Sequence, residues 1–239
     1  MKAIPVKTKL SLLAAGMLLA APSSALATVH YVWQSSPGPA PPYTNWATAA
    51  VTIQQAVDAA AAGDEVVVTN GIYAAGGRAV GTNVLVNRVA VDKPLTLRSV
   101  NGPTNTIIQG YRVPGTTNGD GAIRCVYLTN GASLSGFTLT KGATCAVDND
   151  PPYCESSGGG VWFESTNAFV TNCVIAGNAA YGAGGGAASD ASGHLCTLNN
   201  STLSGNSARY GGGAHGCTLN NCVLTGNWLF TAAVPVIAR

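Results

Sequence analysis

Three segments in the second half of the chain repeat one another without gaps: residues 168–178, 196–206 and 217–227. Their closing asparagines lie 28 and then 21 residues apart. Repeats with periods of about 20–50 residues indicate a solenoid. Gly, Asn and Thr dominate these repeats and are poor helix formers, which excludes a helical solenoid. The repeats therefore predict a coil of short β-strands.

Each copy has an aliphatic residue at its third and eighth positions, where a side chain can pack against its copy in the next turn. Neighbouring turns of such a coil lie about 4.8 Å apart. The fifth position is always asparagine, and we expect these carboxamides to point inward and hydrogen-bond as a ladder: Asn172, Asn200 and Asn221. The closing asparagines either form a similar ladder or occupy left-handed turns after a glycine: Asn178, Asn206 and Asn227.

A single helix is predicted ahead of the strands. Thr52 and Gln55 have the spacing of a capping box, and apolar residues follow at helical intervals up to Ala60. Gly63 is a typical residue just after a helix, and a β-branched run follows it. One short amphipathic helix followed only by strands indicates a cap over one end of the coil.

Two resemblances to known families add to this prediction. The pattern Gly158-Gly-Gly-Val161 followed by Phe169-Val-Thr-Asn172 resembles the repeats of chlamydial polymorphic outer-membrane proteins, although Cys196 and Cys217 replace the phenylalanine in later copies. The first half resembles secreted pectin-lyase-like proteins at residues 52–58, 63–68, 71–73, 93–97 and 106–110. The resemblance implies an all-β fold, a single-stranded right-handed parallel β-helix of about six turns over residues 51–229, with a short N-terminal capping helix.

The N-terminus predicts export. Lys2, Lys7 and Lys9 precede an apolar run over residues 10–21, and Ala25-Leu26-Ala27 matches a signal-peptidase site. We expect residues 1–27 to be a signal peptide and the mature chain to begin near Thr28, with no later transmembrane span. An uncleaved membrane anchor is the alternative, although the run is shorter than the roughly 20 residues of a spanning helix. The expected location is secreted, periplasmic or on the outer surface of a bacterium.

The two ends of the predicted coil differ. Residues 28–50 contain several prolines and are predicted to be an extended segment leading into the coil. Residues 230–239 form an apolar tail without a recognisable cap, which indicates either a truncated chain or a tail folded over the last turn. Because an uncovered strand edge invites pairing, self-association through this edge is a further expectation.

Seven cysteines accompany the predicted export, which makes disulfides possible. Cys145 and Cys154 bracket a polar loop and form the predicted disulfide. An odd number leaves at least one thiol unpaired within the chain. The other five cysteines lie in apolar segments and are expected to be small buried side chains.

A lyase-like site is one hypothesis for the same loop. The resemblance to pectate lyases would require carboxylates that bind calcium and an arginine that abstracts a proton. Asp148, Asp150 and Glu155 are the candidate calcium ligands, with Asp120 further back in the chain. Asp148 and Asp150 are also the candidate catalytic residues, and Arg124 and Arg112 are the candidate bases. The alternative is a solvated loop before two prolines. No resident cofactor is predicted, and calcium is the alternative to an unoccupied loop.

A zinc hypothesis comes from the pairs His194–Cys196 and His215–Cys217, which are 21 residues apart. Stacking one turn on the next would bring four nitrogen and sulfur ligands together. In the alternative, the duplicated cysteines pack inward, or Cys196 is cross-linked to Cys217. Inward-pointing cysteines would make a metal site unfavourable.

Aromatic residues suggest a third kind of site. Sugar rings stack on exposed aromatic side chains, and five aromatics are candidate binding residues: Tyr127, Tyr153, Trp162, Tyr181 and Tyr210. Without the three N-terminal lysines the body is near neutral, so no nucleic-acid partner is expected. The sequence also offers no convincing acid/base pair.

The sequence therefore favours an exported, non-catalytic β-helix that binds polysaccharide or cell-surface macromolecules, in the manner of an adhesin. A calcium-dependent polysaccharide lyase and a structural fragment of a larger surface protein remain the alternatives.

Overall fold

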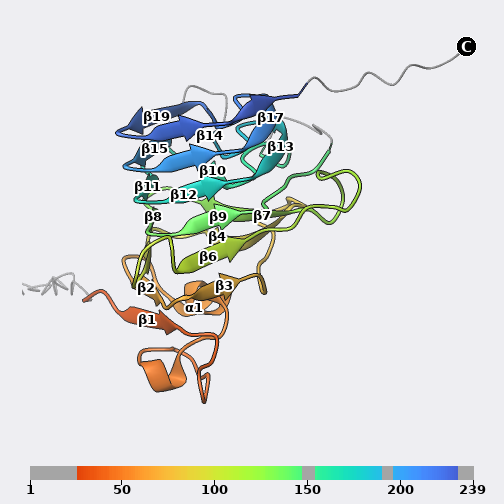
Figure 1. Cartoon of the computed structure of the whole chain (residues 1–239). Coiled ribbons are helices and arrows are strands. Elements are labelled where there is room, and N and C mark those ends of the chain that lie inside the picture. Colours follow the sequence, from red (N-terminus) through yellow and green to blue (C-terminus); the bar gives the residue numbers. More distant parts are fainter. Residues whose placement is uncertain (1–25, 147–153, 190–195, 231–239) are drawn as a thin grey trace, which may run out of the picture.

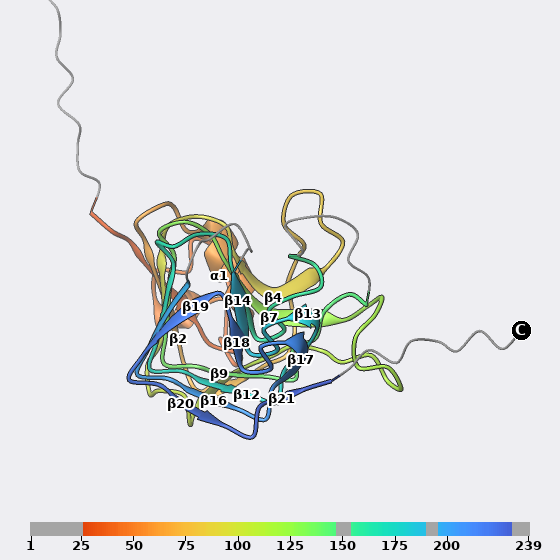
Figure 2. The same ribbon diagram turned by 90° about the horizontal axis from the view of Figure 1, so that it is seen from above.

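The structure is a computed structural model, and it describes residues 26–146, 154–189 and 196–230. Some predictions concern residues that lie outside the described ranges, and these stay predictions: most of the signal peptide, Asp148, Asp150, Tyr153, His194 and the tail from residue 231. In the described part, strands wind into a stack of triangular turns (Figures 1 and 2). Every pair of neighbouring strands is parallel, so the predicted β-helix is confirmed.

Three sheets form the sides of the coil. The first contains β1 (Val29–Val32), β2 (Glu65–Val68), β5 (Thr96–Ser99), β8 (Ser133–Ser135), β11 (Phe169–Thr171), β15 (Cys196–Asn199) and β19 (Cys217–Asn220). The second contains β3 (Gly71–Tyr73), β6 (Thr106–Gln109), β9 (Thr138–Thr140), β12 (Val174–Ala176), β16 (Thr202–Ser204) and β20 (Val223–Thr225). The third contains β4 (Val86–Val91), β7 (Ile123–Leu128), β10 (Val161–Phe163), β14 (Ala187–Ser189) and β18 (Ala214–His215).

A fourth, small sheet extends one corner of the upper turns. It contains β13 (Ala179–Ala183), β17 (Ser207–Tyr210) and β21 (Trp228–Leu229). These strands lie between the second and third sheets along the chain, on the side of the coil where a long loop also projects (Figure 1).

The core is a set of stacked aliphatic rows, as the repeats predict. Val170 pairs with Leu198 in the first sheet, and Ile175 pairs with Leu203 in the second. All four side chains are buried, and their outward neighbours are only partly covered or exposed. Each buried aliphatic side chain stabilises the fold by about 1.5–3 kcal/mol relative to exposure. Repetition of this pattern fixes the register of the turns.

The predicted helix is α1 (Ile53–Ala59), and it covers the first turns. Thr52 and Gln55 form the capping box, with the Gln55 amide donating to Thr52 Oγ1 at 3.3 Å. Gln54, which is buried, accepts from the Ala90 amide at 2.7 Å and donates to the Ala90 carbonyl at 3.2 Å. Its carboxamide thus pairs with the edge of β4, which explains how a helix can close one end of a sheet. Before α1, residues 28–50 supply β1 and a short 3₁₀ helix, η1 (Trp46–Thr48).

The inward ladder predicted for the first asparagine row is formed by the closing row instead. The closing row is the buried ladder: the Asn178 amide donates to Asn206 Oδ1 at 2.9 Å, and the Asn206 amide donates to Asn227 Oδ1 at 3.0 Å. Asn172, Asn200 and Asn221 have φ near +50° and face solvent, so their predicted inward orientation is wrong. The reason is local, because no glycine is available at that corner to take the left-handed conformation.

The far end of the coil is open in the described part of the chain. Leu224 is 49% exposed, whereas Leu203, its partner one turn below, is fully buried. Val223 and Leu229 are also exposed there. Each of the strands β19, β20 and β21 has one pairing partner among the described strands.

Candidate functional site

A loop leaves the coil between Gly110 and Ile123 and forms one wall of a groove. The loop begins as a narrow hairpin, because Tyr111 and Ile123 exchange backbone hydrogen bonds of 2.9 Å. Val113 and Thr117 form a second bridge at its tip. The strands β13, β17 and β21 lie on the same side of the coil (Figure 2). Between them is a groove of about 1010 Å³.

Thr144 fixes the two walls relative to each other. Its amide donates to Asn118 Oδ1 at 3.1 Å, and its carbonyl accepts from the Gly119 amide at 2.9 Å. On the other side, the Tyr181 amide donates to Thr144 Oγ1 at 2.9 Å. Thr144 and Asn118 are buried, so the groove is built on a satisfied, rigid polar network.

The groove combines aromatic and polar lining residues. Tyr181, Trp228 and Phe230 lie along it, and the rings of Trp228 and Phe230 pack edge to face at 6.2 Å. Arg112 and Asp120 contribute one positive and one negative side chain from the loop, and both are exposed. Arg112 also donates to the Gly177 carbonyl, which holds its guanidinium at the groove edge. Flat apolar rings beside a few polar groups are the usual lining of a sugar-binding site.

Of the aromatic candidates, Tyr181 is the one that lies in the groove. Tyr127 and Trp162 are 4% and 2% exposed, so the prediction that they bind a ligand is wrong. They pack with Ala188, Val80 and Cys154 on the outer side of the third sheet, where loops cover them. Tyr210 is exposed and lies beside Arg209, outside the groove lining.

Arg124 is a structural residue and not the predicted catalytic base. Its guanidinium is fully buried and donates to the carbonyls of Gly158 at 2.9 Å and Ser157 at 2.8 Å, and to Asn87 Oδ1 at 2.8 Å. Burial lowers the pKa of Arg124 to about 10, which still leaves it protonated at neutral pH. A cation enclosed by carbonyl groups cannot reach a substrate.

Glu155, the described member of the predicted calcium set, also has a structural role. Its carboxylate accepts hydrogen bonds from the backbone amides of Val84 and Leu85 and anchors that loop. Within the described residues, no group of three or more His, Cys, Asp or Glu side chains could hold a metal ion. The calcium proposal therefore depends on Asp148 and Asp150, which the structure does not describe.

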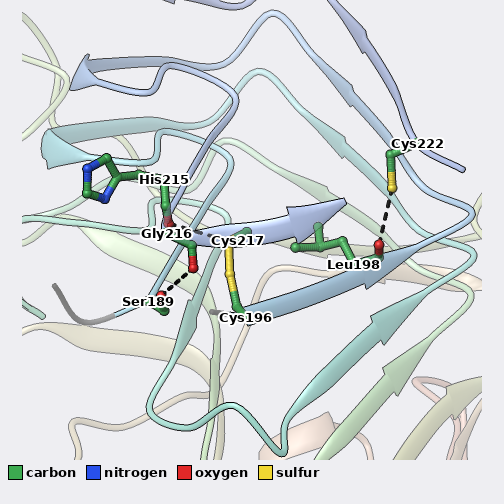
Figure 3. Close-up of a disulfide and its surroundings, with 7 residues drawn as sticks. All are labelled: Ser189, Cys196, Leu198, His215, Gly216, Cys217 and Cys222. Atoms are coloured by element: carbon green, nitrogen blue, oxygen red, sulfur yellow. Dashed lines mark hydrogen bonds between the residues drawn. A yellow bond between two sulfur atoms is a disulfide. The ribbon is translucent and has the colours of Figure 1, made fainter. Parts of the chain in front are cut away.

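The predicted zinc site is replaced by a disulfide. Cys196 and Cys217 pair in register on adjacent turns and are bonded to each other, so neither can supply a thiolate. Figure 3 shows the His215 ring pointing away from the two sulfur atoms. This is the cross-link that the duplicated cysteines allowed, and it excludes a zinc site made from these four residues.

The predicted Cys145–Cys154 disulfide is absent from the structure, where both residues have free thiols. Cys145 packs with Leu85, Ala122 and Ala143, whereas Cys154 packs with Tyr127 and Trp162 in a separate cluster. Burial raises the pKa of both thiols, which favours the unreactive protonated form.

The sequence predicts Arg112 and Asp120 only as members of a lyase-like site, and it does not predict Trp228 and Phe230 as binding residues. Arg112 and Asp120 lie in a Gly- and Thr-rich loop, and Trp228 and Phe230 follow the last repeat. The alternation of Trp228 and Phe230 after Asn227 is the one local signal, since alternate residues of a strand share a face.

Comparisons with known proteins leave the chain without an assigned family. No family model matches it, and no curated protein or solved structure is detectably similar. Among the described residues, no helix has the length and apolar character needed to cross a membrane.

Proposed function

We propose that this protein is an exported, non-catalytic β-helix that binds polysaccharide in the groove between the 111–122 loop and the β13–β17–β21 sheet. The observation that supports the proposal best is the row of Tyr181, Trp228 and Phe230 opposite the polar loop. Tyr181 belongs to β13, whereas Trp228 and Phe230 lie at β21, two strands further along the same sheet. A row of rings along a groove matches an extended chain of sugar units better than a single small molecule.

The groove chemistry favours binding over hydrolysis. Asp120 is the one carboxylate among its described lining residues, whereas most glycosidases need a pair of carboxylates. Arg112 can donate to sugar hydroxyls or carboxylates, and Asp120 can accept from hydroxyls. These groups orient a saccharide without providing an acid/base pair.

Binding can be measured with the mature protein and a panel of insoluble and soluble polysaccharides. We expect co-sedimentation or retardation with at least one of them. We also expect an affinity about five- to thirtyfold weaker for Trp228→Ala and Tyr181→Ala, since stacking on one ring contributes about 1–2 kcal/mol. Tyr210→Ala is the matched control, because it removes an exposed ring outside the groove. Equal loss in all three variants would show that the groove is not the binding site.

The lyase alternative is tested in the same experiment. Polygalacturonate is incubated with calcium and then with a chelator, and unsaturated product is followed by absorbance. Chelator-sensitive product formation would replace the non-catalytic proposal and direct attention to Asp148 and Asp150.

A structural role in a larger assembly is the second candidate function. The last turn favours it, because Val223, Leu224 and Leu229 expose apolar surface and, within the part of the chain that the structure describes, β19, β20 and β21 each have one free edge. Light scattering tests this role, and a monodisperse monomer at all concentrations would count against it.

A further inference from the structure

Asp64 is a buried carboxylate beside the first strand, in the turn between α1 and β2. Its Oδ1 accepts from the backbone nitrogen of Thr28 at 2.8 Å. Its Oδ2 accepts from the Ala61 amide at 2.7 Å and lies 3.0 Å from His30 Nε2. The carboxylate thus joins the start of β1 to the end of the capping helix.

The residue that contacts Asp64 is the predicted first residue of the mature chain. Leu26 is 92% exposed and Ala27 is also exposed, so the bond before Thr28 is accessible. From Thr28 onward the backbone is held by the coil, because the Thr28 carbonyl accepts from the Glu65 amide at 2.9 Å. The peptide bond between Ala27 and Thr28 therefore lies at the boundary between exposed chain and ordered strand.

We propose that cleavage after Ala27 converts the Thr28 amide into an α-ammonium group that forms an ion pair with Asp64 and stabilises the N-terminal cap. A signal peptidase of the export pathway hydrolyses the bond with one water molecule. The C–N bond breaks, the water oxygen becomes part of the Ala27 carboxylate, and the Thr28 nitrogen gains protons to become –NH₃⁺. Cleavage thus replaces a neutral donor by a cation without moving the nitrogen.

The ion pair is favourable at this position because the acceptor is already held in place. The Thr28 amide already donates to an ionised acceptor, and cleavage adds the Coulomb attraction between opposite charges to that hydrogen bond. Before cleavage, His30 is the one side chain among the described residues that contacts the Asp64 carboxylate, and its other ring nitrogen lies 2.6 Å from the Pro42 carbonyl. Burial raises the pKa of Asp64, but hydrogen bonds from Ala61, His30 and Thr28 outweigh it and leave the pKa below its ordinary value.

Other charged side chains on the adjoining elements are already engaged. Glu65 at the start of β2 pairs with Arg98 of β5, and Lys93 donates to the Ala60 carbonyl at 2.9 Å. His30 and Asp64 are therefore the titratable side chains that contact this site among the described residues. The proposal rests on export, as does the proposed function, but not on the groove or its ligand.

The test compares two purified proteins that differ by one residue, a chain starting at Thr28 and a chain that retains Ala27. Both have one α-amino group, but only the first can place it on Asp64. We expect the Thr28 form to melt about 2–4 °C higher at pH 6.5. The gain is present below the usual α-amino pKa of about 8 and is lost as the pH rises through the higher pKa of the paired group.

Two further measurements make the test decisive. Asp64→Asn in both chains should abolish the difference, and if this variant does not fold, the pH dependence of the unsubstituted pair gives the same answer. The intact mass of the exported protein should correspond to a start at Thr28. Equal melting temperatures at pH 6.5, a difference that persists above pH 11, or a different mature N-terminus would each overturn the proposal.

Discussion

Replacement of Asn206 by alanine tests the physical basis of the repeat. The Asn206 carboxamide is fully buried and makes four hydrogen bonds. Oδ1 accepts from the backbone amide and the side chain of Asn178 at 2.9 and 3.1 Å. Nδ2 donates to the Ile175 carbonyl at 2.8 Å and to Asn227 Oδ1 at 2.9 Å.

Asn206→Ala leaves the Asn178 amide and the Ile175 carbonyl buried without these partners. Each unsatisfied buried group costs about 1–3 kcal/mol, so we expect a loss of about 4 kcal/mol in the free energy of unfolding. For a chain of this size, that loss lowers the melting temperature by about 8–16 °C. Urea denaturation followed by far-ultraviolet circular dichroism measures the first quantity, and a thermal scan measures the second.

Asn200→Gly is the matched control for this substitution. Asn200 belongs to the exposed row and has φ near +50°, a conformation that glycine adopts freely. We expect a change within about 1 kcal/mol for this variant, since a surface hydrogen bond is lost and strain is relieved. If Asn206→Ala costs no more than Asn200→Gly, the buried ladder does not stabilise the coil and the reasoning is refuted.

Three further predictions concern packing, the cross-link and pH. Gly186→Ala should lower the free energy of unfolding by several kcal/mol in urea titrations, because the new Cβ would overlap the Gly213 carbonyl. Gly205→Ala should lower it by only about 1 kcal/mol, because the new Cβ meets open space and the alanine is strained only by the left-handed backbone conformation. Reduction of the Cys196–Cys217 disulfide should cost about 3 kcal/mol, measured as the shift in unfolding midpoint on adding a reductant, and no shift would contradict the bond. Because the pKa of Asp64 is lowered in the folded state, its contribution to the free energy of unfolding should be fully present above about pH 4 and should decline as the pH falls through the folded-state pKa. A free energy of unfolding that stays constant below about pH 4 would exclude this contribution.

The repeats predict the core because each turn must copy the last. Leu198 and Leu203 occupy the third and eighth positions, and the period alone places them above Val170 and Ile175. The same argument brings Cys196 onto Cys217, so the cross-link was among the outcomes that the sequence allowed. Where a residue contacts its own copy in the next turn, the sequence alone predicts that contact.

The repeat alone does not specify which of the two asparagine rows points into the core. Gly205 precedes Asn206 and takes the left-handed turn with φ +59°, which frees Asn206 to point inward. Asn200 follows Asn199, so Asn200 itself adopts the turn and its side chain faces solvent. The neighbouring glycine was the available signal, and it decides which row forms the ladder.

The groove could not be predicted because its parts belong to different turns and to a loop outside the repeat. Arg112 lies before β7, whereas Trp228 belongs to β21, more than 100 residues later in the chain. The sequence predicts Tyr127 and Trp162 as binding residues too, but both are buried under loops that lie outside the repeats. Exposure of an aromatic residue on a solenoid depends on these loops and not on its position in the repeat.

The indole resonances of the four tryptophans test the central claim most directly. In a ¹⁵N-labelled sample titrated with oligosaccharides from the polysaccharide that binds, we predict a shift of the Trp228 indole signal. Trp162 is buried. Trp33 follows β1 and Trp46 begins η1, and β1 is the edge strand of the first sheet opposite β19, so the signals of these three residues should remain in place. Saccharide binding that shifts Trp33 or Trp46 and leaves Trp228 unchanged would contradict the groove as the binding site.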